Sequence, residues 1–238
     1  MITDKNRSFY NKFWKNYSIP DPKTWPHWQI IGKFKNKTCL EIGPGTRPKI
    51  PIVNNYFLDI SSEAIKKLQV LGAKASVSDL KTKFPFPQNN FDLVCGFEVL
   101  EHLCNDTFIL KEFERILKPG GYCFVSFPLH QHLFTSYDTF AGHIKRYEPK
   151  NIDTLFRKSG FRIFQYATIS VLWPNNFNSG IAVFLTKQFP AFFSKLQEFF
   201  DSRPNSVMRK PIKWKKWNKE SWKNLMSDNT GIFLAKKL

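Results

Sequence analysis

The chain has 238 residues and a formal net charge of +17, and 42% of its residues are hydrophobic. This length is enough to bury the core of one α/β domain of ordinary size. No apolar run approaches the ~18 residues that would span a bilayer, and the polar residues 1–7 give no sign of secretion. The four cysteines form no Cys-x-x-Cys pair, so we expect reduced thiols and a cytoplasmic location. No metal site is expected, because His130 and His132 lack further ligands nearby.

The high positive charge has two interpretations. Basic proteins gain affinity for nucleic acids by releasing counterions from phosphates. Lysine, asparagine, phenylalanine and isoleucine are, however, frequent along the whole chain, as an A/T-rich coding bias would produce. Such a bias raises the charge without selecting a partner, so the charge alone leaves the partner open.

Strands and helices alternate in the predicted secondary structure. Short apolar segments predict strands at residues 38–42, 56–59, 75–77, 91–96 and 122–127. Helices are expected at residues 61–71, with Ser61 or Ser62 as the cap and Gly72 as the end, and at residues 106–117, with Asp106 as the cap. A helix that begins at Pro149, a strand at residues 161–171 and a last strand at residues 231–235 follow. This alternation predicts a parallel sheet with right-handed crossovers.

A glycine-rich turn at residues 40–45 (Leu-Glu-Ile-Gly-Pro-Gly) directly follows the first predicted strand. Gly43 and Gly45 allow the backbone to approach a ligand closely. An NAD-binding turn would end in Gly or Ala where this chain has Pro48. Pro48 and Pro51 also leave almost no room for the helix whose N-terminus would bind a pyrophosphate. The turn therefore favours a nucleoside-like cofactor without phosphates.

Two aspartates follow the next two predicted strands. Asp59 can accept hydrogen bonds from both hydroxyls of a ribose, and Asp79, with the backbone at Leu80, can receive an adenine amino group. Either aspartate alone would also fit a helix cap or a solvated loop. Because the carboxyl ends of parallel strands meet at one edge of a sheet, the spacing of the two favours ligand binding.

Four segments together resemble the class I S-adenosylmethionine-dependent methyltransferases, in particular the type 11 group that includes the quinone-biosynthesis O-methyltransferases. They are residues 40–45, 56–61, 91–102 (Phe-Asp-Leu-Val-Cys-Gly-Phe-Glu-Val-Leu-Glu-His) and 117–121 (Leu-Lys-Pro-Gly-Gly). Their joint order is specific, although each segment alone is not. Residues 142–149 (Gly-His-Ile-Lys-Arg-Tyr-Glu-Pro) are similar to a segment of members that act on glycans, lipids or unknown small substrates.

The resemblance implies an α/β fold with a Rossmann-like sheet. This sheet would have seven mostly parallel strands with helices on both faces and an antiparallel last strand. We accordingly expect an N-terminal helical cap at residues 1–36, an S-adenosylmethionine-binding domain at residues 37–171, a helical aromatic and basic insertion at residues 172–228, and the final strand of the same domain at residues 229–238.

The resemblance also implies which residues bind S-adenosylmethionine. Glu41, Gly43 and Gly45 would line its methionine and ribose parts, Asp59 with Ile60 its ribose and adenine edge, Asp79 with Leu80 its adenine, and Phe97 with Glu98 the mouth beside the sulfonium. One stretch departs from the family pattern. Arg47 stands where members often have a third glycine, and the first helix is usually longer than Pro48 and Pro51 permit.

A hydroxyl acceptor must lose its proton during methyl transfer. His143 is the preferred general base because histidine titrates in the useful range and this one lies in a loop after the fifth strand. His102 is the second candidate, although Glu98 and His102 are four residues apart and also fit a simple pair at a helix start. Arg146 suits an anionic substrate group and Tyr147 can hydrogen-bond an acceptor. Both could equally pack their loop onto the sheet.

Two late segments have the composition of helices that lie in a membrane interface. In the first, from Phe189 to Phe200, phenylalanines recur at helical spacing. In the second, from Trp214 to Lys223, tryptophans including Trp217 would share one helical face and lysines the other. Peripheral contact with the inner membrane surface would indicate a lipid-linked substrate. The alternative is that both helices cover the active site and their aromatic side chains fill the core.

We therefore expect an S-adenosylmethionine-dependent methyltransferase that methylates an oxygen of a small-molecule, glycan or lipid-linked substrate. An RNA methyltransferase is one alternative. Enzymes that methylate base amino groups usually carry an Asn- or Asp-Pro-Pro-aromatic segment after the fourth strand, where this chain has residues 95–98 (Cys-Gly-Phe-Glu), but ribose or phosphate methylation stays open. A non-catalytic Rossmann-like binding module is the other alternative, and the oligomeric state is left open.

Overall fold

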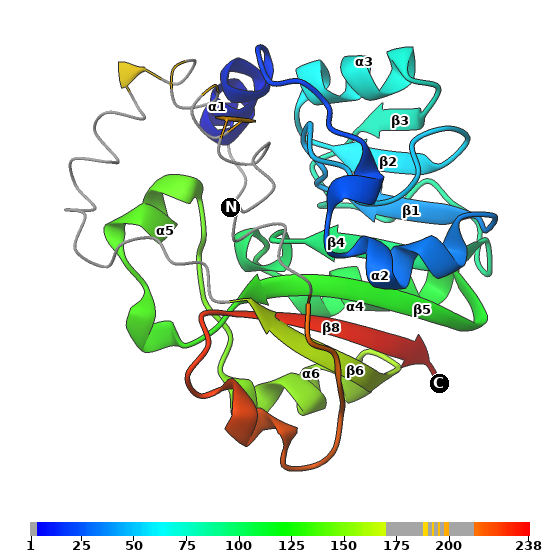
Figure 1. The fold of residues 1–238 in the computed structure, drawn as a ribbon, viewed down its shortest axis with the longest axis vertical. Coiled ribbons are helices and arrows are strands. Elements are labelled where there is room, and N and C mark those ends of the chain that lie inside the picture. The colour runs from blue at the N-terminus through cyan, green and yellow to red at the C-terminus, as the bar shows by residue number, and fades with distance from the viewer. Residues whose placement is uncertain (1–3, 170–187, 190–191, 193–194, 196–197, 200–211) are drawn as a thin grey trace.

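The structure is a computed structural model that describes residues 4–169, 188–189, 192, 195, 198–199 and 212–238. Within these residues, eight strands form one sheet in the order β3-β2-β1-β4-β5-β8-β6-β7 (Figure 1). Strands β1 to β5 run parallel to one another, and β8 runs antiparallel between β5 and β6. The strands are β1 (Cys39–Ile42), β2 (Tyr56–Asp59), β3 (Lys74–Val77), β4 (Phe91–Phe97), β5 (Leu117–Pro128), β6 (Phe161–Ile169), β7 (Lys215–Lys216) and β8 (Thr230–Lys237).

The predicted fold class is confirmed, because the sheet is mostly parallel and its last strand in the chain is antiparallel. The described residues hold one strand more than the seven expected. This extra strand, β7, has two residues and pairs with Gln165 and Tyr166 of β6. The outer edge of β6 offers unpaired backbone N–H and C=O groups, which a passing segment can bind.

Most of the expected helices are present with the expected ends. Ser61 caps α3, since its hydroxyl accepts from the N–H of Ala64, and Gly72 follows with a left-handed φ of 85°. The cap of α4 is Asn105 and not Asp106, because the side chain of Asn105 accepts from the N–H of Phe108. The helical segments are α1 (Asp4–Trp14), η1 (Pro22–Thr24), α2 (Trp28–Ile31), η2 (Gly32–Phe34), α3 (Ser62–Val70), η3 (Leu100–His102), α4 (Asp106–Ile116), η4 (Gln131–Leu133), α5 (Ser136–Ala141), η5 (Pro149–Asn151), α6 (Ile152–Lys158) and η7 (Ser221–Leu225).

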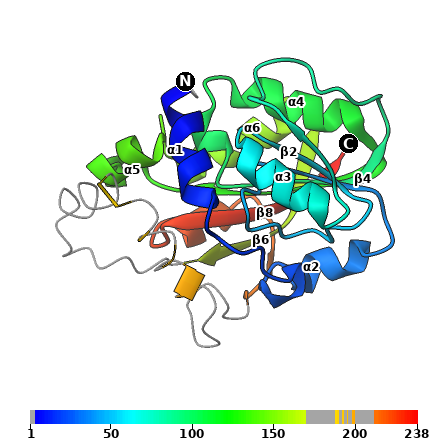
Figure 2. The same ribbon diagram turned by 90° about the horizontal axis from the view of Figure 1, so that it is seen from above.

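Helices cover both faces of the sheet and form a three-layer domain (Figure 2). On one face, Phe113 of α4 and Phe156 of α6 belong to the larger core cluster. On the other, Ile31 of α2 and Leu68 of α3 belong to a second cluster. Burial of apolar side chains at roughly 25 cal/mol per Å² supplies the main favourable term for such a sandwich.

No helix lies between β1 and β2, in agreement with the effect expected of Pro48 and Pro51; this holds for residues 43–55, all of which are described. A helix after β1 would normally cover part of the neighbouring face. Here Ile30 and Ile31 of α2 pack in the same cluster as Ile50 of the loop. The N-terminal segment therefore covers part of the face that the missing helix leaves bare.

The expected helix from Trp214 to Lys223 is wrong. This segment is extended through β7 and then forms η7. Because side chains alternate between the two faces of an extended segment, Trp214 packs with the second core cluster and Trp217 with the larger one. Their indole N–H groups donate to Gln29 and Asp153. Trp214 and Trp217 are thus partly buried against the core, as the alternative interpretation expected of the aromatic side chains, although the segment is not the helix that it assumed.

The other proposed membrane segment, from Phe189 to Phe200, lies in large part outside the described residues. Phe189, Phe192 and Phe199 are described and exposed. In the described part of the chain, no helix is both long and apolar enough to cross a membrane. The division into a domain and a cap insertion stays a prediction, since residues 170–187 and 200–211 of that region are not described.

Lys67 of α3 holds the end of α1 in place. Its ammonium group donates to the carbonyl oxygens of Trp14, Lys15 and Tyr17 at 2.8, 2.7 and 2.8 Å. Hydrogen bonds from a charged donor to a protein carbonyl contribute about 1.5–3 kcal/mol when well shielded, and less when partly exposed. Lys67 therefore links the N-terminal helix to the sheet domain.

We expect the substitution Lys67→Met to lower the free energy of unfolding by about 1–3 kcal/mol, since it leaves the three carbonyls to water. Urea unfolding measures the change, and limited proteolysis should show faster cleavage near residues 15–17. Lys66→Met is the matched control, because exposed Lys66 pairs only with Glu63 among the residues that the structure describes. Equal stability of the two variants would contradict this role of Lys67.

Candidate active site

The glycine-rich turn after β1 has the conformation that its glycines permit. Gly43 and Gly45 have φ angles of 62° and 54°, which a residue with a Cβ rarely adopts. A Cβ on Gly43 would lie 2.5 Å from a methyl carbon of Val99. The turn therefore needs glycine here and presents bare backbone at the carboxyl end of β1.

Asp59, at the carboxyl end of β2, is buried and joins two loops. One carboxylate oxygen accepts from the N–H of Gly45 and the other from the N–H of Ser61, both at 2.7 Å. Burial raises the pKa of Asp59 to about 6, although these N–H groups oppose the shift. Each oxygen has a second lone pair, so the carboxylate can accept further hydrogen bonds from a ligand.

Glu41, also buried, fixes the loop that replaces a helix after β1. Its Oε2 atom accepts from the N–H groups of Lys49 and Ile50 at 2.8 and 3.1 Å. Burial raises the pKa of Glu41 to about 7, while the nearby charge of Lys49 acts in the opposite direction. Direct contact of Glu41 with a cofactor stays a prediction.

The remaining predicted cofactor residues follow β2, β3 and β4. Half-buried Ile60 follows Asp59, and Asp79 follows β3 and accepts from the N–H of Lys81. Leu80 is buried with a φ of 58°. Because β1, β2, β3 and β4 are parallel neighbours, their carboxyl ends meet at one edge of the sheet.

The two residues predicted to form the mouth differ in surroundings. Phe97 packs against His27 and Phe124, with ring centroids 4.7 and 5.0 Å away, which ties it to the core beneath the sheet edge. Glu98 is exposed, has a φ of 55° and accepts a 2.6 Å hydrogen bond from the hydroxyl of Ser126. A non-glycine residue in this conformation is uncommon and often marks a functional site.

Helix α1 lies against this edge, which the sequence did not indicate (Figure 1). A Cβ on Gly45 would lie 2.5 Å from the ring of Trp14, Asn11 accepts a hydrogen bond from the hydroxyl of Ser61, and the hydroxyl of Tyr10 donates to the carbonyl of Ala141. The edge thus offers bare backbone, an acceptor carboxylate and aromatic side chains, without the helix N-terminus that a pyrophosphate needs. This chemistry fits S-adenosylmethionine, a nucleoside without phosphates.

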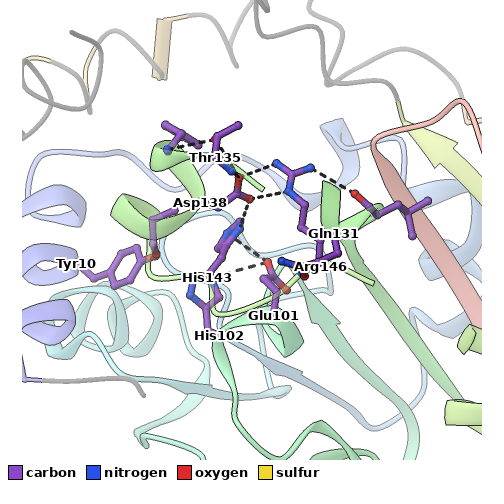
Figure 3. Close-up of polar contacts among 11 residues, drawn as sticks. Tyr10, Glu101, His102, Gln131, Thr135, Asp138, His143 and Arg146 are labelled. Carbon is purple, nitrogen blue, oxygen red and sulfur yellow. Dashed lines mark hydrogen bonds and ion pairs between the residues drawn. The ribbon is translucent and has the colours of Figure 1, made fainter. Parts of the chain in front are cut away.

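Asp138 organises the second part of the site, shown in Figure 3. It is fully buried and accepts from Nδ1 of His143 at 2.9 Å, from two nitrogens of Arg146 at 2.9 Å and from the N–H of Thr135 at 2.8 Å. Burial acts to raise the pKa of Asp138, but the hydrogen bonds from His143 and Arg146 hold it below the usual range. Asp138 is not among the residues predicted from the sequence, although Thr135 and Asp138 have the spacing of a capping box.

Glu101 and His102 of η3 lie close to His143. The Oε1 atom of Glu101 lies 3.6 Å from Nε2 of His143 and 3.8 Å from Nε2 of His102, and the two imidazole centroids are 4.7 Å apart. The N–H of Ile144 donates to the carbonyl of Glu101 at 2.9 Å, which joins the two segments. The structure therefore brings together both histidines predicted as catalytic and adds Glu101.

Burial shifts the pKa values of this cluster. It raises the pKa of Glu101 well above the usual range, and the negative charge of Glu98 raises it further. It also lowers the pKa of His102 to about 4, with a smaller contribution from His143. His102 is therefore a neutral imidazole near pH 7.

Arg146 and Tyr147 pack their loop onto the domain. Arg146 binds Asp138, and the hydroxyl of the buried Tyr147 donates to Asp106 at 2.9 Å. A cavity of about 390 Å³ has both residues in its lining together with Gln131. Contact of Arg146 or Tyr147 with a substrate stays a prediction.

Comparison with known proteins supports the same assignment. A family model described as a methyltransferase domain matches residues 24–166. The ubiquinone/menaquinone biosynthesis C-methyltransferases UbiE of Vibrio cholerae and Escherichia coli are 26% and 28% identical to the chain, and each alignment covers 56% of this chain and 55% or 57% of the relative. The chain thus aligns with only about half the length of these curated relatives.

Solved structures share the fold at low sequence identity. A putative sarcosine dimethylglycine methyltransferase from Galdieria sulphuraria matches with a TM-score of 0.57 at 11% identity, over 100% of this chain and 98% of that one. A possible histamine N-methyltransferase from Thermotoga maritima matches with a TM-score of 0.54 at 15% identity, over 89% and 94% of the two chains. With the family match over more than half of its length, the chain belongs to the methyltransferase domain family, among the class I S-adenosylmethionine-dependent methyltransferases.

Proposed function

We propose that the chain transfers a methyl group from S-adenosylmethionine to an oxygen atom of an acceptor bound beside His143. The proposal rests on the hydrogen-bonded pair of Asp138 and His143. This pair lies next to the carboxyl ends of β1 to β4, which we call the cofactor edge. Helix α1 connects the two regions. Tyr10 donates a hydrogen bond to the carbonyl of Ala141, two residues before His143, and Asn11 accepts one from the hydroxyl of Ser61, whose N–H binds Asp59.

The cofactor residues have divided tasks in this proposal. The bare backbone at Gly43 and Gly45 would pass close to the methionine and ribose parts, and Asp59 would accept hydrogen bonds from the ribose hydroxyls. Asp79 and the backbone at Leu80 would meet the adenine, and Glu98 the mouth of the site. When bound, S-adenosylmethionine supplies a methyl group that its positive sulfur makes electrophilic.

The acceptor hydroxyl would meet Nε2 of His143. Because Nδ1 of His143 is bonded to Asp138, Nε2 is the ring atom available to take a proton. His102 is a weaker proton acceptor, since its pKa is lowered to about 4, but its neutral ring can accept a hydrogen bond. Arg146 acts in this scheme by positioning Asp138.

Methylation of a carbon atom is the second candidate. It is supported by the UbiE relatives, which are named as C-methyltransferases in ubiquinone and menaquinone biosynthesis. The two reactions give different products from one phenolic acceptor, because O-methylation forms a methyl ether and C-methylation forms a new carbon–carbon bond. NMR of the product distinguishes them by the chemical shift of the transferred methyl group.

Methyl transfer itself can be tested with labelled S-adenosylmethionine and a panel of catechols, quinols, sugars and RNA. We expect His143→Asn to lower kcat by roughly 10²–10⁴-fold, the usual contribution of a positioned acid or base, without weakening S-adenosylhomocysteine binding. His132→Asn is the control, because His132 is exposed and lies outside the cluster. Full activity of the His143 variant would contradict its role, and absence of transfer to every acceptor in the panel would count against the proposal.

We expect Asp59→Ala to weaken S-adenosylhomocysteine binding by about 10- to 100-fold, because hydrogen bonds to a charged group contribute about 1.5–3 kcal/mol. Isothermal titration calorimetry measures the change. Asp21→Ala is the control, since exposed Asp21 caps only the short helix η1. Unchanged affinity of the Asp59 variant would remove this residue from the cofactor site.

Cofactor affinity should also depend on pH through Asp59. Its pKa is raised to about 6, so the carboxylate accepts two ribose hydroxyl donors above pH 6 and loses acceptor capacity when protonated below it. Affinity should therefore fall as the pH decreases from 7 to 5, and Asp59→Asn should remove this dependence. Glu41, whose pKa is raised to about 7, is tested in parallel with Glu41→Gln. A decline that persists in the Asp59 variant and disappears in the Glu41 variant would assign the pH dependence to Glu41.

A further inference from the structure

Three side chains with metal-ligand atoms converge beside the cofactor edge. One ligand atom each of Glu101, His102 and His143 lies within 4.8 Å of the other two. Figure 3 shows these three side chains close together. Glu101 and His102 come from η3, which follows β4, and His143 comes from the loop after α5. The sequence predicts no metal site, because these segments are far apart in the chain and only the fold joins them.

Glu101 differs from the other buried carboxylates of the described residues. Glu41, Asp59, Glu112 and Asp138 each accept backbone N–H groups. Glu101 is fully buried, and neither of its oxygens has a hydrogen-bond partner on another residue in the described part of the chain. An isolated buried carboxylate costs several kcal/mol unless a cation or a hydrogen-bond donor compensates it. Its Oε1 atom faces the Nε2 atoms of His143 and His102.

His143 has the orientation that metal binding requires. The bond from Nδ1 of His143 to Asp138 is the arrangement in which a carboxylate orients a metal-bound imidazole and directs Nε2 to the ion. The Nε2 atom of His143 lies on the side of Glu101 at 3.6 Å.

We propose that Glu101, His102 and His143 bind one divalent transition-metal ion. Bonds of about 2.0–2.2 Å in a tetrahedral arrangement place neighbouring ligand atoms about 3.4 Å apart. The measured 3.6 and 3.8 Å from Glu101 Oε1 to the two Nε2 atoms are close to this spacing. Two imidazoles and one carboxylate suit Mn²⁺, Fe²⁺, Co²⁺ or Zn²⁺ rather than Mg²⁺, which prefers oxygen ligands.

The site deepens the proposed function and rests on it for the identity of the acceptor. Three protein ligands leave coordination positions open, and an acceptor hydroxyl bound there has a lowered pKa and releases its proton to solvent. The acceptor oxygen then bonds to the methyl carbon while the carbon–sulfur bond breaks, which yields a methyl ether and neutral S-adenosylhomocysteine. In this scheme Nε2 of His143 binds the ion and does not take the proton. The ion, and not His143, activates the acceptor hydroxyl. An acceptor with two adjacent oxygens, such as a catechol or a vicinal diol, would occupy two positions.

The test is titration of the full chain with Co²⁺ alone, after removal of metals by a chelator. We expect saturable binding of one Co²⁺ per chain by calorimetry, together with visible absorption bands of the bound ion. Glu101→Gln and His143→Asn should each weaken binding by roughly tenfold or more, and Asp138→Asn, which changes a positioning residue, by about 10- to 100-fold. His132→Asn, outside the cluster, should leave binding unchanged.

Glu101→Gln also controls for loss of folding. It preserves the side-chain volume and removes a buried charge, so the metal-free Tm should not fall. The increase in Tm that Co²⁺ produces in the unmodified chain should disappear in this variant. If the metal-free Tm of this variant stays high and Co²⁺ no longer raises it, Glu101 is a ligand of the ion.

Two results would overturn the proposal: no saturable Co²⁺ binding up to about 1 mM, which corresponds to about −4 kcal/mol, or binding that both ligand substitutions leave unchanged. Titration with S-adenosylhomocysteine in chelator separates this failure from failure of the proposed function. Cofactor binding and methyl transfer without metal binding would leave the proposed function intact and reject the ion. Metal binding without cofactor binding would support the ion and reject the proposed function.

Discussion

Buried carboxylates that accept backbone N–H groups hold the loops of this sheet edge in place. Asp59 joins the turn after β1 to the start of α3 through Gly45 and Ser61, and Glu41 fixes the loop at Lys49 and Ile50. Backbone N–H groups away from water must find acceptors, and a helix after β1 would have supplied them. Because the prolines exclude that helix, the cofactor edge depends on these two acidic side chains for its shape.

The same principle explains the second half of the site. Asp138 forms the capping box of α5 with Thr135 and binds both His143 and Arg146, so one buried carboxylate fixes the orientation of the His143 ring. Glu101 is the exception, since among the described residues no other residue donates a hydrogen bond to its buried carboxylate. Asp59, Glu41 and Asp138 accept hydrogen bonds and stabilise the fold. Glu101 accepts none from another described residue, and it is the carboxylate that we propose as a metal ligand.

The N-terminal segment covers part of the sheet face that has no helix after β1. Its short helix α2 packs on the sheet face beside the loop at Ile50, and α1 lies against the glycine-rich turn through Trp14. Lys67 joins α1 to α3. Helix α1 also contacts the chain near His143 through Tyr10, so it joins the glycine-rich turn to the loop that carries His143.

The sequence alone determined the positions of the first five strands and their parallel direction, the absence of a helix near Pro48 and Pro51, and the placing of Asp59 at a strand end, because all three follow from local patterns and from the geometry of parallel strands. The order of the strands in the sheet came only from the tertiary structure. It misjudged the segment after Trp214, where the core and not helical propensity decides the conformation. Only the tertiary structure brought Glu101, His102 and His143 together and showed that Asp138 orients His143. These contacts join residues far apart in the chain, and the burial that gives them their chemistry exists only after the chain has folded.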